Sequence, residues 1–214
     1  DLGVPMATIK AALDPLPLSG YEIQTERVER SGIAACRFWV SIEGNQPSRH
    51  WPAIRSLLEA ASHLPGGARQ LALRAFEILA RAEAEVHGTD SDAVHFHEVG
   101  AVDSIVDMVA AAVALDHLGA RVVGSPLPLG RGFVQTRHGC MPAPAPATVL
   151  CLRGIPTHDA GIDGELVTPT GAALLTAAAS DFARWPAMKT ERVGWGAGAR
   201  ELPKLAFRLG KDKH

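Results

Sequence analysis

His95–Asp107 reads His-Phe-His-Glu-Val-Gly-Ala-Val-Asp-Ser-Ile-Val-Asp, and this stretch decides how the rest of the chain is interpreted. The imidazoles of His95 and His97 are two positions apart, so on a strand they would share one face. Gly100 interrupts the extended pattern, and the apolar residues that follow recur at helical spacing as far as Gly119. The stretch therefore predicts the end of a strand, a tight turn and a helix.

Potential metal ligands are concentrated in the same stretch. Asp103 and Asp107 are four positions apart in the first turns of the predicted helix, where the helix dipole alone already favours acidic residues. The imidazoles and carboxylates form a nitrogen and oxygen ligand set that suits Zn, Ni, Fe or Mn, and the spacing differs from the His-Glu-x-x-His helix of metalloproteases. We take as candidate metal ligands His95, His97, Glu98, Asp103 and Asp107.

Upstream of this stretch the pattern predicts a long helix over Ala68–Val86, capped by Gly88. His87 falls in its last turn, where a cation suits the dipole, and is also a weaker site candidate. Pro65-Gly66-Gly67 precedes the helix and indicates a boundary. We therefore predict a hairpin and short-helix subdomain over residues 1–65 and a main α/β part over 66–214 that carries the His/Glu/Asp site, although the two parts could form one compact domain.

The N-terminal subdomain is predicted to contain a β-hairpin. Tyr21–Val28 and Ile33–Ile42 both alternate, and Ser31-Gly32 between them is a turn signal. A short helix begins at about Met6, and another covers Pro52–Ala61.

Downstream of the central helix, candidate anion-binding groups follow short extended segments. Arg121–Gly124 is predicted to be a strand, and Ser125–Val134 an extended segment that leads into a glycine-flanked arginine. That arginine, Arg131, offers a planar fork suited to phosphate or carboxylate, or is simply a solvated loop residue. His138, in the following turn, is a candidate ligand or acid.

Thr168 is predicted to be the N-cap of a helix that begins at Pro169. Thr170 and Gly171 would then present amide N–H groups at a helix N-terminus, which is a ready anion site, although most Thr-Pro helix starts are plain caps. The glycine-rich segment Gly194–Gly198 lacks a strand–helix context, so we interpret it as a turn and not as a nucleotide fingerprint.

The composition excludes several classes of protein. The chain has 214 residues and a formal net charge of -2 without a basic run, so nucleic-acid binding is not indicated. No apolar run is long enough to span a bilayer, and three scattered cysteines make neither a disulfide framework nor a Cys-x-x-Cys site. We predict a cytoplasmic α+β protein: a β-hairpin subdomain followed by a mixed sheet flanked by alanine-rich helices.

Four segments together resemble the N-terminal domain of the LarC-type nickel-insertion proteins, which make the nickel-pincer cofactor of lactate racemase: His95–Asp107, Ser125–Val134, Pro142–Thr148 and Gly164–Leu175. The resemblance covers nearly the whole chain in the same order. It implies a lyase-type nickel chelatase, or cyclometallase, that inserts nickel into pyridinium-3,5-bisthiocarboxylic acid mononucleotide in a CTP-dependent reaction.

The resemblance also implies that parts of the family pattern lie outside this chain. Members open with a strand and a Ser-Gly-Ile-Ser-Gly-Asp-Met-type loop and carry a C-terminal domain that handles CTP with a divalent metal, Mn or Mg. We therefore expect a fragment that is incomplete without that nucleotide-binding domain, supplied by the same protein or by a separate chain. We also expect a homo-oligomer and no nucleic-acid or membrane partner.

Nickel insertion requires a releasable metal site, an anion pocket for the substrate phosphate and a base for the ring proton. The pocket candidates are Arg131, Thr168, Thr170 and Gly171, and the candidate catalytic bases are His97, Glu98 and His138. Two other classes remain open. A metal-dependent hydrolase would also use a His-x-His pair, and a non-catalytic oligomeric assembly domain would explain the alanine-rich helices.

Overall fold

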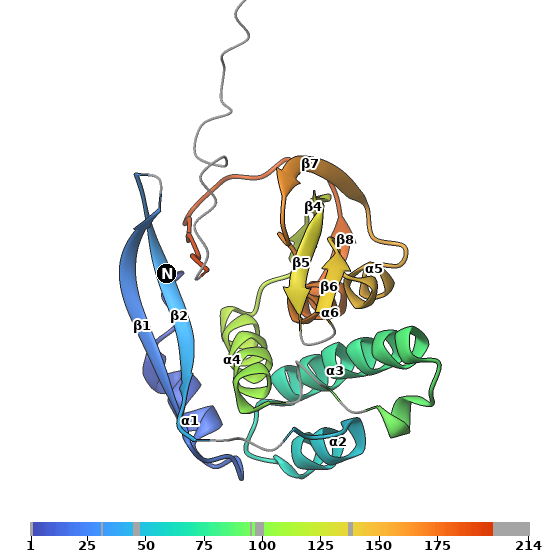
Figure 1. Cartoon of the computed structure of the whole chain (residues 1–214). Helices are drawn as coiled ribbons and strands as arrows, with labels where there is room; N and C mark the ends of the chain where they lie inside the picture. The colour runs from blue at the N-terminus through green and yellow to red at the C-terminus, as the bar shows by residue number, and fades with distance from the viewer. Residues whose placement is uncertain are drawn as a thin grey trace, which may run out of the picture.

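The computed structural model describes residues 2–30, 32–44, 48–94, 96, 101–136 and 139–198. It is a mixed α+β arrangement in which the helices pack together between the long hairpin and a group of short strands (Figure 1). The helices in these ranges are α1 (Met6–Leu13), α2 (Trp51–Ala60), α3 (Gly66–His87), α4 (Val102–Leu118), α5 (Pro146–Cys151) and α6 (Pro169–Ala178), together with the 3-10 turn η1 (Ser91–Ala93). The strands are β1 (Tyr21–Arg30), β2 (Ile33–Ile42), β3 (Val122–Gly124), β4 (Leu127–Arg131), β5 (Phe133–Thr136), β6 (Gly139–Pro142), β7 (Thr157–Asp163) and β8 (Ala179–Phe182).

The two alanine-rich helices, α3 and α4, form the centre of the core. α3 packs against α2, α4, α5 and α6, and short alanine side chains let these helices approach closely. The predicted apolar stripe of α4 is confirmed, because the side chains at all four of its positions are buried: Val102, Val106, Val109 and Val113. The predicted glycine caps are also confirmed, since Gly88 and Gly119 follow α3 and α4 in the left-handed conformation.

The predicted β-hairpin is confirmed. β1 and β2 pair antiparallel from Tyr21↔Ile42 to Arg30↔Ile33, and Gly32 in the turn has φ +80°, which a residue with a side chain rarely adopts. The pleat places alternate residues on opposite faces, so Thr25, Arg27 and their partners in β2 face the same way. This face lies toward α4, which contacts β2.

The prediction of one mixed sheet is wrong for the part of the chain that the structure describes. Its strands form four separate two-stranded sheets: β1–β2 and β5–β6 are antiparallel, and β3–β8 and β4–β7 are parallel. Most of these strands are only three to five residues long. Pro128 in β4 also lacks the N–H that a further neighbour would need.

Gly194–Gly198 is not the turn that its glycines predicted. The segment runs beside β2, where the Cys36 N–H donates to the Trp195 carbonyl at 2.8 Å and the Ala197 N–H donates to the Cys36 carbonyl at 3.0 Å. Figure 1 shows this red segment crossing to the hairpin after β8. The reason is that β2 offers unpaired backbone groups along its outer edge, and a small-residue segment can approach them closely.

The buried core contains residues from both sides of position 65, among them Ile9, Ile54, Phe76 and Val109. The division of the chain at this position stays a prediction. Among the helices within the described ranges, none combines the length and the apolar character that crossing a membrane would require.

Candidate functional site

Four of the candidate site residues, His95, His97, Glu98 and His138, lie outside the described residues. The prediction of a strand before Gly100 is not supported at Val94 or Phe96, the described residues there, because neither belongs to a strand.

Phe96, which stands between His95 and His97 in the sequence, packs in the core. Its side chain is 1% exposed, and its ring centroid lies 6.3 Å from that of Phe76 on α3. The Ser48 hydroxyl donates a hydrogen bond to the Phe96 carbonyl. These contacts anchor the middle of the candidate metal-binding segment to the core.

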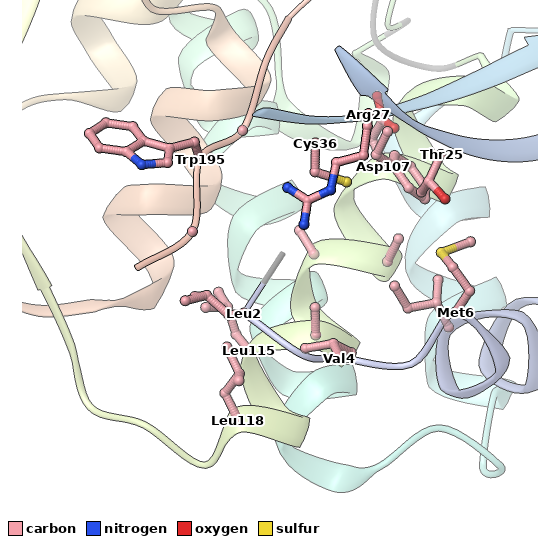
Figure 2. A pocket seen from close by; sticks show the side chains of 17 residues that line it. Leu2, Val4, Met6, Thr25, Arg27, Cys36, Asp107, Leu115, Leu118 and Trp195 are labelled. Carbon is pink, nitrogen blue, oxygen red and sulfur yellow. The ribbon is translucent and has the colours of Figure 1, made fainter. Parts of the chain in front are cut away.

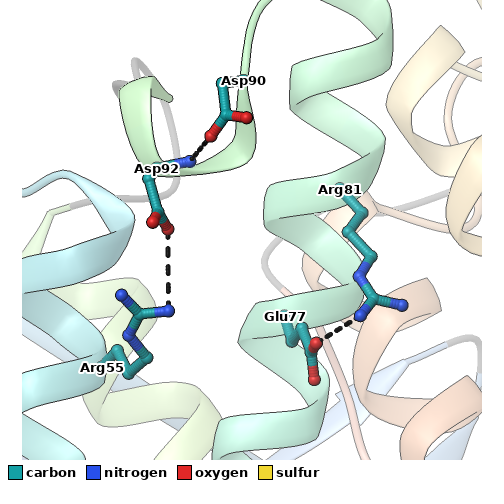
Figure 3. Close-up of polar contacts among 5 residues, drawn as sticks. All are labelled: Arg55, Glu77, Arg81, Asp90 and Asp92. Carbon is teal, nitrogen blue, oxygen red and sulfur yellow. Dashed lines mark hydrogen bonds and ion pairs between the residues drawn. The ribbon is translucent and has the colours of Figure 1, made fainter.

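The turn that leads into this segment is held by polar contacts. The Asp90 carboxylate accepts a hydrogen bond from the Asp92 N–H at 2.8 Å and so caps η1. Arg55 on α2 forms an ion pair with Asp92, with an N–O distance of 3.6 Å (Figure 3). Figure 3 also shows an ion pair within α3, between Glu77 and Arg81, which are four positions apart. The Arg55–Asp92 pair therefore ties the approach to the candidate site to α2.

Asp103 and Asp107 lie on one side of the first turns of α4, as predicted. The Asp103 carboxylate accepts a hydrogen bond from the Ser104 N–H at 2.8 Å, and Asp103 is half-buried. Asp107 is exposed, yet protein atoms displace part of the water around its carboxyl. This desolvation, and secondarily the charge of Asp103, raises the pKa of Asp107 to about 6.

No group of three or more His, Cys, Asp and Glu side chains within the described ranges is placed to hold a metal ion. Asp103 and Asp107 therefore supply at most part of a ligand set. The other candidate ligands, His95, His97 and Glu98, lie outside the described residues, so their part in a metal site stays a prediction. Cys151 is a poor candidate, because burial raises the pKa of its thiol to about 12.

The candidate phosphate-binding groups already have partners within the protein. Arg131, at the end of β4, forms an ion pair with Asp163 on β7 at 3.2 Å, and both side chains are exposed. Thr168 is the N-cap of α6, as predicted, and its hydroxyl accepts the Gly171 N–H at 3.2 Å. The prediction of a free Gly171 amide is therefore wrong, because this N–H already donates to Thr168. Thr170 lies beside it in the first turn. Their role in binding phosphate stays a prediction.

A cavity of about 690 Å³ opens beside Asp107, and the sequence did not indicate it (Figure 2). It lies between the hairpin, α1, α4 and the segment Gly194–Gly196. Its polar lining includes Thr25, Arg27 and Cys36 of the hairpin, and Trp195 stands at its edge. The alternation of β1 and β2 groups these hairpin residues on one face, but it does not show that α4 would lie opposite and leave space.

Replacing Asp107 with asparagine is expected to stabilise the chain at pH 8 and to have little effect at pH 4. The raised pKa means that the folded state binds a proton more readily than the unfolded state, so stability falls as pH rises from about 4 to about 6. The gain at pH 8 should be on the order of 1 kcal/mol, since solvent screens the exposed side chain. Urea unfolding at both pH values measures it.

Asp103→Asn should weaken the same pH dependence in the chain that retains Asp107, because it removes the neighbouring negative charge. A gain from Asp107→Asn that is equal at both pH values would contradict the assignment.

Paired carboxylates on α4, preceded in the sequence by His95 and His97, are donors of the kind that bind divalent transition metals. The chain belongs to the nickel insertion protein family, whose model matches residues 1–209. A relative named for nickel insertion, from Geobacter metallireducens, is 52% identical over 208 residues, which are 96% of this chain and 53% of the relative. A similarly named relative from Syntrophotalea carbinolica is 50% identical over 203 residues, or 94% of this chain and 51% of the relative.

The chain thus spans about half the length of these curated relatives. No solved structure matches it.

Proposed function

We propose that this chain takes part in the insertion of nickel into pyridinium-3,5-bisthiocarboxylic acid mononucleotide, acting as part of a CTP-dependent cyclometallase. The product would be the nickel-pincer cofactor used by lactate racemase-type enzymes. The observation that carries the proposal is the family match over residues 1–209. The aspartates of α4, which follow His95, His97 and Glu98 closely in the sequence, add a chemical reason, because imidazole and carboxylate bind Ni(II) and can release it.

In this proposal His95, His97 and Glu98 bind nickel, and Asp103 and Asp107 complete the ligand set or orient the imidazoles. One turn of α4 separates the two aspartates, so both can act on the same side of the helix. When nickel bonds to the ring carbon of the substrate, the proton on that carbon must leave. His97, Glu98 or His138 would accept it.

Substrate phosphate would bind at the N-terminus of α6 through Thr168, Thr170 and Gly171, or to Arg131 at the end of β4. Phosphate binding there would require Arg131 to exchange or share its contact with Asp163. CTP, with Mn or Mg, would bind to the part of the longer relatives that this chain does not span, present in the same protein or as a separate partner.

Nickel titration calorimetry tests the metal assignment. His97→Ala and Glu98→Ala should each weaken nickel binding by about tenfold or more, because each removes a proposed ligand. His158→Ala is the matched control, since His158 is exposed on β7, a strand outside the proposed metal site, and it should leave nickel affinity unchanged.

Unchanged nickel affinity in both site variants would defeat the ligand assignment. For the reaction itself, mass spectrometry should detect the nickel-containing product when nickel, CTP, the mononucleotide and the C-terminal half of a relative are added. Hydrolysis of generic phosphate esters with metal alone would favour a hydrolase instead.

A further inference from the structure

The cavity beside Asp107 exists because α4 presents alanines to the hairpin. Ala110, Ala111 and Ala114 line one wall, and their short side chains leave the space between α4 and β2 unfilled. At about 690 Å³ the cavity falls within the range of roughly 300–1,000 Å³ that is usual for small-molecule sites. Most of the remaining wall is apolar, with Met6, Phe38 and Leu115 among its residues.

Both a cationic and an anionic side chain enter this apolar space. Arg27 extends from β1 toward α4, and Asp107 lies on the hairpin side of α4 (Figure 2). Both charged side chains are exposed at the rim of the cavity, so each can meet a charged group of a ligand whose body lies against the apolar wall. The lining therefore favours a ligand that has an apolar, flat body and carries charges of its own over a purely hydrocarbon ligand.

We infer that this cavity binds the aromatic ring of the organic substrate, with the Arg27 guanidinium holding one of the anionic groups of that substrate. This inference rests on the proposed function. A pyridinium ring with carboxyl-type substituents combines a flat apolar surface, a positive charge and negative groups. Phe38 and the alanines of α4 would contact the ring, Asp107 would complement its positive charge, and Arg27 would donate to the anionic group.

The position of the cavity connects it to the proposed nickel site. Asp107 belongs to the cavity wall, and Asp103 lies one turn nearer the start of α4. A ring bound here would thus lie at the side of α4 that carries both candidate carboxylate ligands. The cavity, and not the exposed Arg131–Asp163 pair, would then position the ring carbon toward the metal.

Binding of nicotinic acid mononucleotide, a pyridinium mononucleotide with one carboxylate and a phosphate, tests this inference. Calorimetry without nickel should detect binding to the 214-residue chain. Arg27→Gln should weaken binding by about tenfold, because it removes a charge-assisted hydrogen bond to the anionic group. Ala114→Phe should abolish binding by filling the cavity, and its circular dichroism spectrum should match that of the wild type.

Arg37→Gln is the matched control. Arg37 is in the same hairpin but on the opposite face, where it pairs with Glu26 at 3.3 Å and lies 5.0 Å from the Trp39 ring centroid. It should leave probe binding unchanged. The inference is overturned if the wild-type chain does not bind the probe, or if Arg27→Gln binds it as tightly as the wild type does.

The nickel titrations separate this inference from the proposed function. Loss of probe binding in Arg27→Gln, together with unchanged nickel affinity in His97→Ala and Glu98→Ala, would sustain the cavity and reject the metal assignment. Weaker nickel binding in those two variants, together with unchanged probe binding in Arg27→Gln, would support the metal assignment and reject the inference about the cavity.

Discussion

Replacing Phe96 with alanine is expected to lower the free energy of unfolding by about 3–5 kcal/mol, the usual cost of removing a buried phenyl ring. Phe96 is 1% exposed and packs on Phe76, which in turn stacks on Trp51 with ring centroids 6.5 Å apart. The cavity left by the ring would border α2 and α3, whose packed side chains cannot collapse fully into it. Urea denaturation followed by circular dichroism measures the change.

The same substitution should also weaken nickel binding, because Phe96 is the anchor between His95 and His97. Phe96→Leu retains most of the apolar volume and should cost no more than about 1.5 kcal/mol. Phe133→Ala is the matched control, since Phe133 is 73% exposed and its loss should change stability by less than about 0.5 kcal/mol. A Phe96→Ala chain as stable as the wild type would show that the ring does not pack in the core.

Replacing Gly130 with alanine is expected to destabilise the chain by about 3 kcal/mol, at the upper end of the cost of overpacking. A Cβ atom at this position would lie 1.8 Å from the Gly164 carbonyl oxygen, and that neighbour is backbone, which cannot move aside as a side chain can. The two segments are also held together by the hydrogen bond from the Gly164 N–H to the Arg131 carbonyl, at 2.8 Å. The substitution would therefore force β4 away from β7.

Gly66→Ala is the matched control for Gly130→Ala. It lies in the first turn of α3, has no positive φ, and a Cβ atom there would meet nothing within 4 Å. Alanine at this position should leave the unfolding midpoint unchanged or raise it slightly. An equal effect of the two substitutions on thermal unfolding would argue against the close approach of β4 and the loop after β7.

The elements that depend on local sequence could be predicted. α3, α4 and the β1–β2 hairpin have long periodic patterns, glycine caps or a turn signal, and all three were found within a few residues of their predicted bounds. The Thr168 cap of α6 was also predictable, because a cap requires only the residues next to it. Such features are encoded within one stretch of chain.

The elements that depend on distant partners could not be predicted. β7 and β8 were missed, because each acquires its strand conformation by pairing with a strand much earlier in the chain, β7 with β4 and β8 with β3. The pairing of Gly196 with Cys36 was missed for the same reason. Arg27 and the cavity were missed because the space depends on how far the hairpin stands from α4, a distance that no periodicity encodes.

Residues near the start and near the end of the described chain close the same wall of the cavity. Arg192 donates to the Leu2 carbonyl across 190 positions, and Cys36 pairs with Trp195 and Ala197. Contacts that join such remote positions carry a large loop-closure entropy and tend to form late in folding. The helices and the hairpin would assemble first, and the cavity would become complete only when residues 192–197 dock. A folding intermediate without this step would be well structured and still lack the closed cavity wall.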